Sequence, residues 1–185
     1  ELGYRVKLLG ITRYDKGFLS QRVHPAMIDR DLPIAGVMDG FTALAVDGDF
    51  IDRTFYQGRG AGAGPTASAV VADLLDIARG YSRPAFFMPA SKLTQAKAVS
   101  ISERKGAYYV RFHVEDDAAV IADITLHLES VSISVETMLQ KTTDRDGTIY
   151  VILVTNIITE TTLKDVLNRI NKLSSVLEEP LSIRI

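Results

Sequence analysis

The last 80 residues alternate between two kinds of hydrophobic period, and this pattern constrains the fold more than any other feature of the sequence. In four segments apolar residues alternate with polar ones or form a short apolar run, as in strands, and in two others they recur every three or four residues, as in amphipathic helices. Strands are expected at 108–114, 131–140, 148–154 and 181–185, a hairpin turn at 144–147, and helices at 118–128 and 160–173. The order βαββαβ is the ferredoxin-like plan, in which two helices cover one face of a four-stranded antiparallel sheet. The other face is then free to pair with a neighbour.

The first part of the chain is rich in strand-like runs. Strands are expected at 4–12 and 18–28 and in two runs within 41–57. Two groups of turn-forming residues separate these runs, namely Asp15-Lys16-Gly17 and Asp47-Gly48-Asp49. Pro25 indicates that the second strand ends there or lies at the edge of the sheet. The pattern predicts an antiparallel or mixed sheet. Residues 81–105 carry prolines and mixed polarity, and they are expected to form a linker with local order across 86–88.

Four alternating glycines stand between the last of these strands and a helix. They occupy positions 58, 60, 62 and 64, and the helix is expected over 67–80, where apolar residues recur at spacings of three and four. Pro65 suits the first turn, and Thr66 is an alternative cap. Glycine lets main-chain N–H groups approach a ligand, and a helix N-terminus adds partial positive charge, so one interpretation is a cofactor-facing loop. The other is a tight strand-to-helix connection without a ligand, and the spacing alone favours neither.

As a nucleotide-binding motif, the glycine run is incomplete. A dinucleotide fingerprint requires an acidic residue at a strand end about 20 residues further on. Asp73 and Asp76 instead fall inside the expected helix. A P-loop would need Gly-Lys-Ser/Thr, which does not follow. The loop by itself is therefore not expected to bind a dinucleotide well.

Composition excludes several classes of function. The chain has no cysteine, which rules out disulfides, thiolate metal ligands and a cysteine nucleophile, and is compatible with a reducing cytoplasm. The formal charge is +2 up to Arg104 and -4 after it, so neither half is basic enough to indicate nucleic-acid binding. No apolar run reaches the roughly 18 residues of a membrane helix, so no membrane partner is expected. The chain begins at Glu1 within an apparently folded region, which suggests a piece of a longer polypeptide.

Side chains suited to catalysis or metal binding are few. His24, His113 and His127 are the only imidazoles, and they lack the spacing of metal ligands, so no metal site is expected. We interpret His24 as a structural or interface residue rather than a base, and the other two as ordinary surface or packing residues. No serine lies in a nucleophile elbow.

Residues 58–80, GRGAGAGPTASAVVADLLDIARG, resemble a signature near the end of the catalytic region of homoserine dehydrogenases. The preceding ELGYRVKLLGI, QRVHPAMI and Gly-Asp hairpin match that family in order and spacing over residues 1–80. The resemblance implies an NAD(P)-dependent oxidoreductase that interconverts homoserine and aspartate semialdehyde. It also implies that Gly60, Ala61 and Gly62 lie beside the nicotinamide, with Gly62 the strongest candidate. The family's usual Asn-Ala in the strand before the hairpin is Thr42-Ala43 here.

The resemblance places the catalytic residues of that family before the start of this chain. They are a lysine for proton transfer and acidic residues that hold the substrate amino group, and the Rossmann fingerprint would also precede Glu1. None of Lys7, Lys16 and Lys92 lies in the matching motif, so no catalytic residue is assigned. Hydride transfer needs a bound nicotinamide, a positioned alcohol and a proton acceptor, and this chain supplies at most an edge of the cofactor pocket. The chain alone is expected to be inactive and to hold no cofactor, and the choice between NAD and NADP stays open.

The segment VEDDAAVIADITLHLESVSISVETMLQK resembles the first half of an ACT domain, a small amino-acid-sensing module, and the match covers about residues 107–185. The resemblance implies that two modules pair and bind an amino acid at their interface, against the first strand-to-helix turn and the second strand. Asp116, Ala119, Val120 and Ser132 stand at the corresponding positions, and threonine is the effector that the family implies. The family's Pro-Gly is Ala118-Ala119 here, and Ala carries a Cβ where glycine allows close approach. The alternative is a module that serves only as a dimerisation platform.

Together these features predict an α+β chain in three parts. They are a sheet-rich fragment of a homoserine dehydrogenase catalytic domain at 1–80, a linker at 81–105 and a ferredoxin-like ACT regulatory domain at 106–185. The favoured function is the C-terminal portion of a cytoplasmic, allosterically regulated enzyme of threonine and methionine biosynthesis. The alternative is a stand-alone regulatory or binding protein with a degenerate catalytic remnant. A homo-oligomer, dimer or tetramer, is expected. RNA binding is disfavoured because the central strands lack paired aromatic and basic residues.

Overall fold

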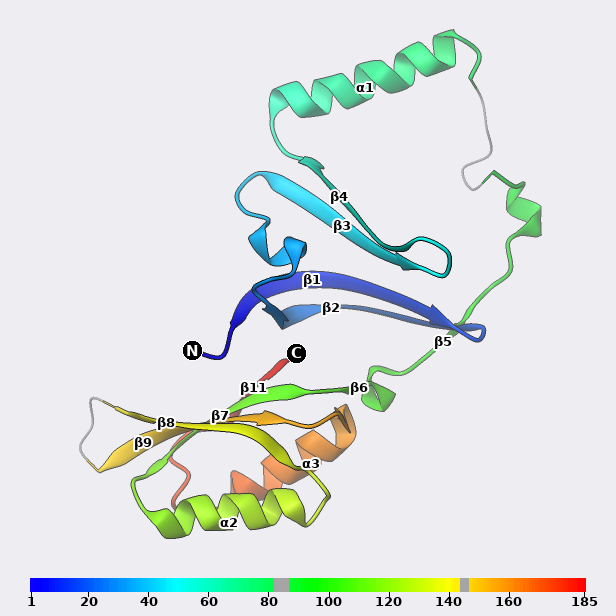
Figure 1. Cartoon of the computed structure of the whole chain (residues 1–185). Coiled ribbons are helices and arrows are strands. Elements are labelled where there is room, and N and C mark those ends of the chain that lie inside the picture. The colour runs from blue at the N-terminus through cyan, green and yellow to red at the C-terminus, as the bar shows by residue number, and fades with distance from the viewer. Residues whose placement is uncertain (82–86, 144–146) are drawn as a thin grey trace. The chain divides into compact units, whose positions relative to one another are not determined.

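The computed structural model describes residues 1–81, 87–143 and 147–185 (Figure 1). The chain is a sheet-rich mixture of α and β elements, as the sequence predicts. It forms two compact units, which are Glu1–Arg5 with Asp29–Gln95 and Val6–Ile28 with Ala96–Ile185. The three-part division at residues 80 and 105 stays a prediction, and the compact units follow other boundaries. None of the helices in the described part of the chain combines the length and hydrophobicity that a membrane span requires.

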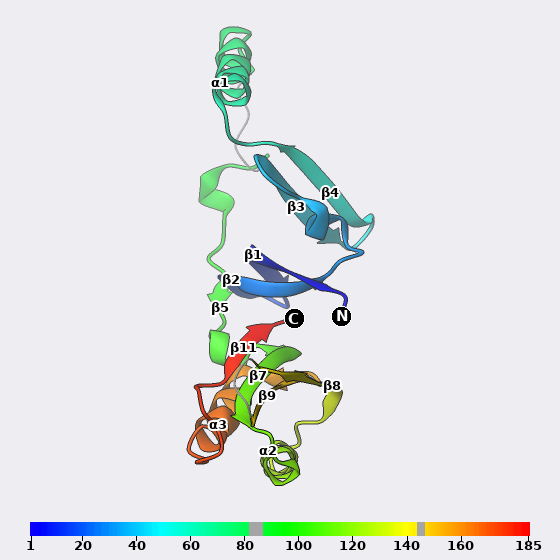
Figure 2. The ribbon, with the colours of Figure 1, turned by 90° about the vertical axis from the view of Figure 1, so that its left-hand side faces the viewer.

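The second unit contains the helices and strands predicted over 108–185, in the predicted order. They are β7 (Tyr108–Glu115), α2 (Ala118–Glu129), β8 (Val135–Thr142), β9 (Thr148–Thr155), α3 (Glu160–Ile170) and β11 (Leu181–Arg184). The strands lie in the order β11-β7-β9-β8 with antiparallel neighbours. Both helices lie on the same face of this sheet (Figures 1 and 2). Two short strands, β6 (Lys105–Gly106) and β10 (Ile158–Thr159), pair with each other beside it.

Two of the predicted boundaries over these residues are wrong. The strand expected at 131–140 begins only at Val135, because α2 ends in a Schellman turn in which Ser132 adopts a left-handed φ of 60°. In that turn the N–H of Ile133 donates to the carbonyl of Leu128 at 3.0 Å. Helix α3 ends at Ile170 rather than at residue 173. The hairpin turn expected at 144–147 lies, apart from Gly147, outside the described residues.

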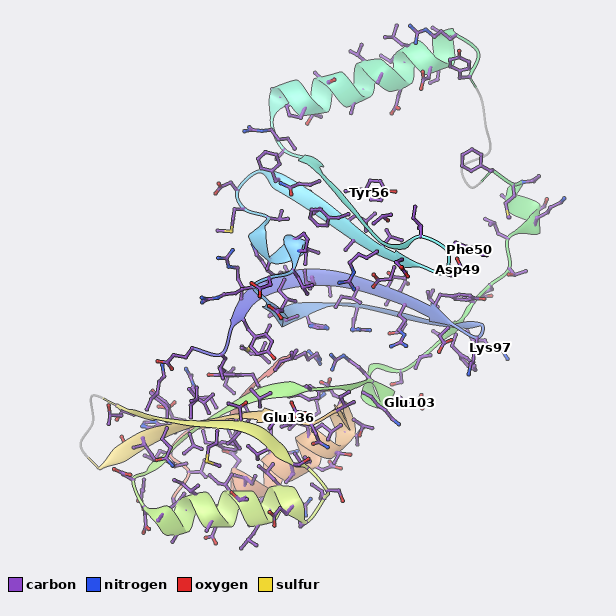
Figure 3. All side chains as sticks on the ribbon, in the orientation of Figure 1. Asp49, Phe50, Tyr56, Lys97, Glu103 and Glu136 are labelled. Carbon is purple, nitrogen blue, oxygen red and sulfur yellow. The ribbon has the colours of Figure 1, made fainter. Side chains whose placement is uncertain are left out.

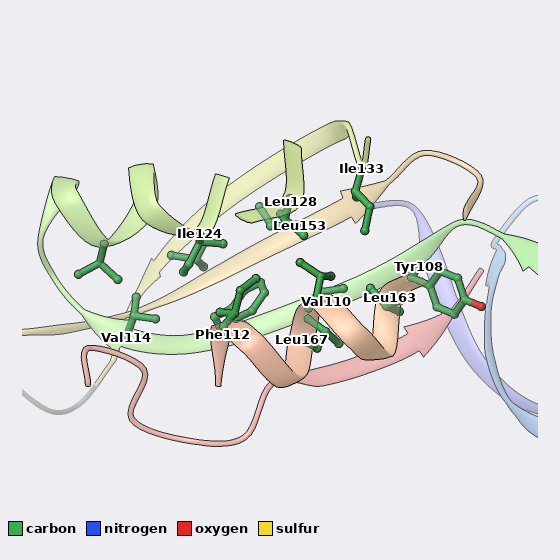
Figure 4. Packing of buried hydrophobic residues seen from close by; sticks show 14 of the residues in the cluster. Tyr108, Val110, Phe112, Val114, Ile124, Leu128, Ile133, Leu153, Leu163 and Leu167 are labelled. Atoms are coloured by element: carbon green, nitrogen blue, oxygen red, sulfur yellow. The ribbon is translucent and has the colours of Figure 1, made fainter. Parts of the chain in front are cut away.

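The core of the second unit lies between this sheet and its two helices (Figure 4). Every second side chain of β7 is buried, as the alternation along residues 108–114 requires. The buried positions of α2 are spaced four residues apart, so they form one stripe on the helix. The largest buried side chains of β7, α2 and α3 are Tyr108, Val110, Phe112, Val114, Ile124, Leu128, Leu163, Val166, Leu167 and Ile170.

Strands from the N-terminal part of the chain extend this sheet. Strand β1 (Tyr4–Asp15) pairs with β2 (Phe18–Asp29), and β2 pairs in parallel with β11, where Ala26 lies opposite Arg184. The short strand β5 (Lys97–Ala98) also pairs with β2. Strand β2 therefore covers the β11 edge of the four-stranded sheet. The sequence predicted both long strands, but it gave no sign of their partner.

The first unit holds an antiparallel hairpin and a helix. Its elements are η1 (Pro33–Gly36), β3 (Phe41–Gly48), β4 (Asp52–Arg59), α1 (Ala63–Ala78) and η2 (Ala90–Lys92). The turn expected at 47–49 is wrong, because Asp47 and Gly48 still pair with β4 and residues 49–51 make the connection. Phe50 at this tip is 97% exposed (Figure 3). Helix α1 begins four residues before the predicted start at residue 67.

The expected linker contains more regular structure than predicted. Within residues 81–105 the chain forms η2, β5 and a further short helix, η3 (Ile101–Glu103). The N–H groups of Lys97 and Val99 donate to carbonyls at the start of β2, so this stretch adds a strand to the sheet edge. Local order is expected across 86–88. Residue 86 lies outside the described residues, and Phe87 has a φ of 55°.

Candidate functional site

The glycine loop joins β4 to α1, and two of its glycines have local reasons to be glycine. A Cβ at Gly60 would lie 2.9 Å from the side-chain Oγ1 of Thr42 on β3, so any larger residue at position 60 would force that side chain to move. Gly62 has a φ of 114° and is the residue that precedes the first turn of α1. The N–H of Thr66 donates to the carbonyl of Gly62 at 3.2 Å, so Thr66 is inside the helix and is not its cap. A tight strand-to-helix connection therefore accounts for glycine at positions 60 and 62 without any bound ligand.

The same loop also has the properties of an anion-accepting helix end. Gly60, Ala61 and Gly62 are all exposed. No side chain caps α1, and its first turn holds no acidic residue, so the partial positive charge of the helix end is uncompensated. Main-chain N–H groups in this position suit a phosphate or a polarised amide.

Helix α1 presents apolar side chains to solvent. None of its residues is buried. Its large apolar residues, between 48% and 71% exposed, are Val70, Val71, Leu74, Leu75 and Ile77. Their spacings of three and four residues place them on one broad face of the helix, and such a face is normally packed against another element. Among the described residues, none covers this face of α1.

The residues predicted to bind an effector lie at the two ends of α2. Asp116 and Ala119 stand at the start of the helix, whereas Ser132 follows its end, and 12 helical residues span about 18 Å. Asp117, rather than Asp116, caps the helix, and its Oδ1 accepts the N–H of Ala119 at 2.8 Å. Val120 is buried in the core. One copy of the chain therefore does not bring the predicted residues together.

Ser132 lines a hollow between the end of α2 and the start of β8. Its volume is about 470 Å³, and the residues around it are Thr125, Glu129, Ser132, Ile133, Ser134 and Val135. We call it the α2–β8 hollow. Ser132 is placed there by the Schellman turn, in which its own N–H donates to the carbonyl of Glu129 at 2.9 Å. Its hydroxyl, not its backbone N–H, is what this residue offers to a ligand.

A buried charged cluster at the start of α3 was not predicted. Glu160 is 5% exposed, and its carboxylate accepts hydrogen bonds from Arg184 Nε at 2.9 Å, from Arg184 Nη2 and from the hydroxyl of Tyr108 at 3.0 Å. Burial alone would raise the pKa of Glu160, but the bonds from Arg184 and Tyr108 outweigh it and hold that pKa below its ordinary value. Burial, together with the nearby carboxylate, raises the pKa of the Tyr108 phenol.

Arg104 completes this cluster from the segment before β6. Its Nη1 donates to the hydroxyl of Tyr108 at 3.1 Å and its Nη2 to the carbonyl of Ile185 at 3.2 Å. The guanidinium lies so close to Gly106 that a Cβ there would meet it at 2.6 Å. Glycine at 106 thus makes room for the charge.

The three histidines have separate environments. His24 is 6% exposed, and its Nδ1 lies 2.9 Å from the carbonyl of Pro25. His113 lies between Glu178, 3.0 Å from Nδ1, and Thr148, 3.2 Å from Nε2. His127 is exposed and bonds its own helix. Within the described residues no three His, Asp or Glu side chains are placed to bind a metal ion.

Comparison with known proteins matches the whole chain to one enzyme family. A family model described as homoserine dehydrogenase matches residues 1–75. Homoserine dehydrogenase of Pseudomonas aeruginosa is 34% identical over 191 residues, which cover 100% of this chain and 44% of that protein. A crystal structure of the enzyme from Thiobacillus denitrificans superposes on 99% of this chain and 42% of its own with a TM-score of 0.85 at 35% identity. Over its whole length, the chain is similar to homoserine dehydrogenases.

The match covers the C-terminal part of the homoserine dehydrogenases. The Helicobacter pylori enzyme is likewise 34% identical over 186 residues, with 100% of this chain and 44% of that protein covered. The chain thus spans less than half the length of the curated relatives it matches. Staphylococcus aureus homoserine dehydrogenase shares the fold over 98% of the chain, with a TM-score of 0.61 at 24% identity.

Sequence reasoning missed the buried charged cluster because its members are far apart in the chain. The signal that was available is the alternation in β11, which places Arg184 on the same side of the sheet as Tyr108, its partner across the two strands. An arginine at a core-facing position requires a buried carboxylate. The homoserine dehydrogenase motifs contain no hint of which carboxylate that is.

Proposed function

We propose that this chain is the C-terminal part of an NAD(P)-dependent homoserine dehydrogenase and contributes one wall of its cofactor pocket. The observation that carries the proposal is the match to this family over the full chain, which includes the glycine loop and α1. Helix α1 exposes its apolar residues in this chain, as a helix does when its packing partner lies in a segment not included. The parent reaction interconverts homoserine and aspartate semialdehyde.

The residues present fit a role beside the nicotinamide. The cofactor, when bound, supplies the hydride acceptor for the substrate alcohol. The main chain of Gly60, Ala61 and Gly62 is exposed at an uncapped helix end, and the methyl group of Ala61 is the largest side chain among these three residues. In the proposed role these residues orient the ring and exclude water from one side of it. The proton acceptor for the alcohol would come from the segment before Glu1.

A pair of polypeptides tests this proposal. The 185-residue chain is expected to show no turnover of homoserine with NAD or NADP, whereas a polypeptide that adds the coding sequence upstream of Glu1 is expected to be active. In the longer polypeptide, A61V should raise the KM for the cofactor while leaving the fold intact, as monitored by circular dichroism, because Ala61 is exposed and lacks the positive φ of Gly62. G64A, at a glycine with open space around it, is the matched control. Turnover by the short chain would overturn the proposal, and an upstream stop codon would favour a stand-alone regulatory protein.

We further propose that residues 107–185 form an ACT-type module that senses an amino acid such as threonine. Support comes from the βαββαβ order, from the strand order β11-β7-β9-β8 and from the α2–β8 hollow beside Ser132. Because Asp116 and Ser132 lie at opposite ends of α2, an effector that contacts both must sit between two copies of the module. The proposal therefore includes a homo-oligomer.

Asp117 limits which part of an amino acid can lie at the start of α2. Its carboxylate already accepts from Ala119, and it would repel the carboxylate of an effector. The amino group is the better match for the Asp116–Asp117 turn, with the effector carboxylate toward the partner's hollow. Calorimetry with threonine, at concentrations where the oligomer is present, should give heat that D116N reduces. The absence of heat with every standard amino acid would leave a dimerisation platform as the function.

A further inference from the structure

A group of basic side chains surrounds His24 on the helix side of the extended sheet, and it carries more positive charge than the residues near it compensate. Arg22 and His24 lie on β2, which pairs with β11, the strand of Arg184, and Arg104 interacts electrostatically with both. We call these four residues the basic cluster. Of the three guanidinium groups, that of Arg184 is hydrogen-bonded to the buried carboxylate of Glu160. All of these residues belong to the second unit.

The basic cluster also contains hydrogen-bond donors without acceptors. The donors Nε of Arg22 and Nε of Arg104 are buried and have no hydrogen-bond partner among the described residues, and the same holds for the ring nitrogen Nε2 of His24. Arg184 donates from Nε and Nη2 to Glu160, and the terminal nitrogens of Arg104 donate to Tyr108 and Ile185. Buried donors are nearly always paired in folded proteins, so unpaired ones at one place indicate that an acceptor is missing.

Among the described residues, the charged groups that act on Arg22 and His24 do not include that acceptor. The charged or titratable groups that interact with Arg22 and His24 are Arg13, Arg104, Arg184 and Tyr108, and Lys164 is 3.6 Å from the Glu160 carboxylate. All of them are cationic or, for Tyr108, a donor committed to Glu160. Burial and then the neighbouring arginines lower the pKa of His24, so the imidazole stays neutral and adds no further charge.

We propose that the basic cluster is a binding site for a small oxyanion, and that a phosphate group is its best ligand. The four oxygens of a phosphate can meet more of the unpaired donors than the two oxygens of a single carboxylate. Guanidinium groups offer planar pairs of donors whose geometry fits phosphate and carboxylate oxygens. A neutral His24 in the tautomer that donates from Nδ1 to the Pro25 carbonyl leaves Nε2 as an acceptor, which can accept a hydrogen bond from the P–OH group of a monoprotonated phosphate.

Arg22 is the side chain that has to move for an anion to reach the basic cluster. It is only partly buried, and its one hydrogen bond among the described residues is from Nη1 to the hydroxyl of Ser20 at 3.0 Å. Arg104 is held by two hydrogen bonds and by its position 5.4 Å from the ring of Tyr108. An anion therefore enters by displacing Arg22 from Ser20 and engaging its guanidinium. This inference is independent of the proposed dehydrogenase role, because it uses none of the glycine-loop residues.

The test is a titration of the 185-residue chain with inorganic phosphate at pH 7.5 and constant ionic strength maintained with NaCl. Calorimetry should detect saturable binding, and phosphate should raise the Tm where an equal ionic strength of NaCl or sodium acetate does not. R22Q should weaken phosphate binding about tenfold or more, since a hydrogen bond to a charged group contributes about 1.5 kcal/mol or more. R169Q, which removes an exposed arginine at the end of α3, should bind phosphate as the wild type does.

Two further readouts keep the proposal falsifiable if the arginine variants lose stability. In a ¹⁵N-labelled sample, phosphate should shift the Nε2 resonance of His24 and leave that of the exposed His127 unchanged. Acetate that binds as tightly as phosphate would replace the phosphate assignment with a carboxylate site. Equal stabilisation by phosphate and chloride, or an unchanged phosphate affinity in R22Q, would overturn the proposal.

Discussion

The guanidinium of Arg184 in the last strand donates two hydrogen bonds to the buried carboxylate of Glu160, the first residue of α3. The pair links β11 to the helix that covers the sheet. Because Glu160 also accepts from Tyr108 on β7, three elements of the second unit converge on one carboxylate. Several of the expected behaviours of this protein follow from that convergence.

Removal of Arg184 should destabilise the second unit strongly. R184M leaves the Glu160 carboxylate buried without its main partner, and breaking a buried pair from one side costs about 3 kcal/mol. K164M is the matched control, because Lys164 contacts the same carboxylate from solvent and an exposed ion pair contributes at most about 1 kcal/mol. Urea unfolding of both variants measures the difference. Equal losses in the two variants would contradict the prediction.

Stability should fall in two separate steps as the solution is acidified. The pKa of His24 is lowered in the folded chain, so stability is complete above its ordinary value of 6.5 and is lost as the pH falls below that value. The pKa of Glu160 is also lowered, so its contribution is present above 4.5 and is lost as the pH falls through its folded-state pKa.

Substitutions at these two residues separate the steps. H24Q should remove the upper step and E160Q the lower one, in urea unfolding measured between pH 8 and pH 3. An H24Q variant that keeps the wild-type dependence between pH 7 and pH 5 would show that another group titrates there.

The contact of Gly60 with Thr42 should be visible as a coupling between two substitutions. G60A places a Cβ 2.9 Å from the Thr42 hydroxyl, and such overpacking costs about 1–3 kcal/mol. In T42A the nearest remaining atom would be the Cβ at 3.6 Å, which is ordinary contact, so T42A/G60A should recover most of the loss. Thermal unfolding of the four chains gives the coupling energy. Additive effects would mean that the hairpin moves to accept the methyl group.

Helix α2 allows the core to be tested with two substitutions two residues apart. I124A removes a side chain that is 1% exposed and should cost about 2–5 kcal/mol, since it leaves a cavity between the helix and the sheet. L126A removes one that is 61% exposed and should change stability by no more than about 0.5 kcal/mol. Denaturant unfolding with a common m-value measures both. A large loss in L126A would place this side of α2 in an interface between copies.

Helix α1 should respond to substitution only when its partner is present. L74S removes an exposed leucine, so in the 185-residue chain it should leave the Tm unchanged or raise solubility. In a polypeptide that includes the coding sequence upstream of Glu1, the same change should lower the Tm by several degrees, because a packed leucine is lost. An identical response in both polypeptides would argue against α1 packing on an upstream domain.

The sequence by itself determined the local structure, because local structure depends on periods that repeat within a few residues. The alternation of residues 108–114 and the stripe of Leu163, Val166, Leu167 and Ile170 each fixed an element and its buried face. The glycine run and its neighbours were also sufficient to indicate the family. The functional residues placed on those motifs, Gly60 to Gly62 and Asp116 to Ser132, stay predictions, because their ligands involve segments or copies outside this chain.

Only the tertiary structure decided which distant segments meet. The sequence of β2 does not predict that Ala26 pairs with Arg184, because the alternation of a strand determines which face is buried but not which strand lies beside it. The same holds for the basic cluster, whose charges are separated by more than 150 residues of sequence and meet only when β2 joins the edge of β11. Strand pairing selects among many strand edges that could form similar hydrogen bonds, and the partner can lie anywhere in the chain. The hydrophobic period of an element depends only on residues close together in the sequence. This physical difference separates what the sequence determined from what the tertiary structure decided.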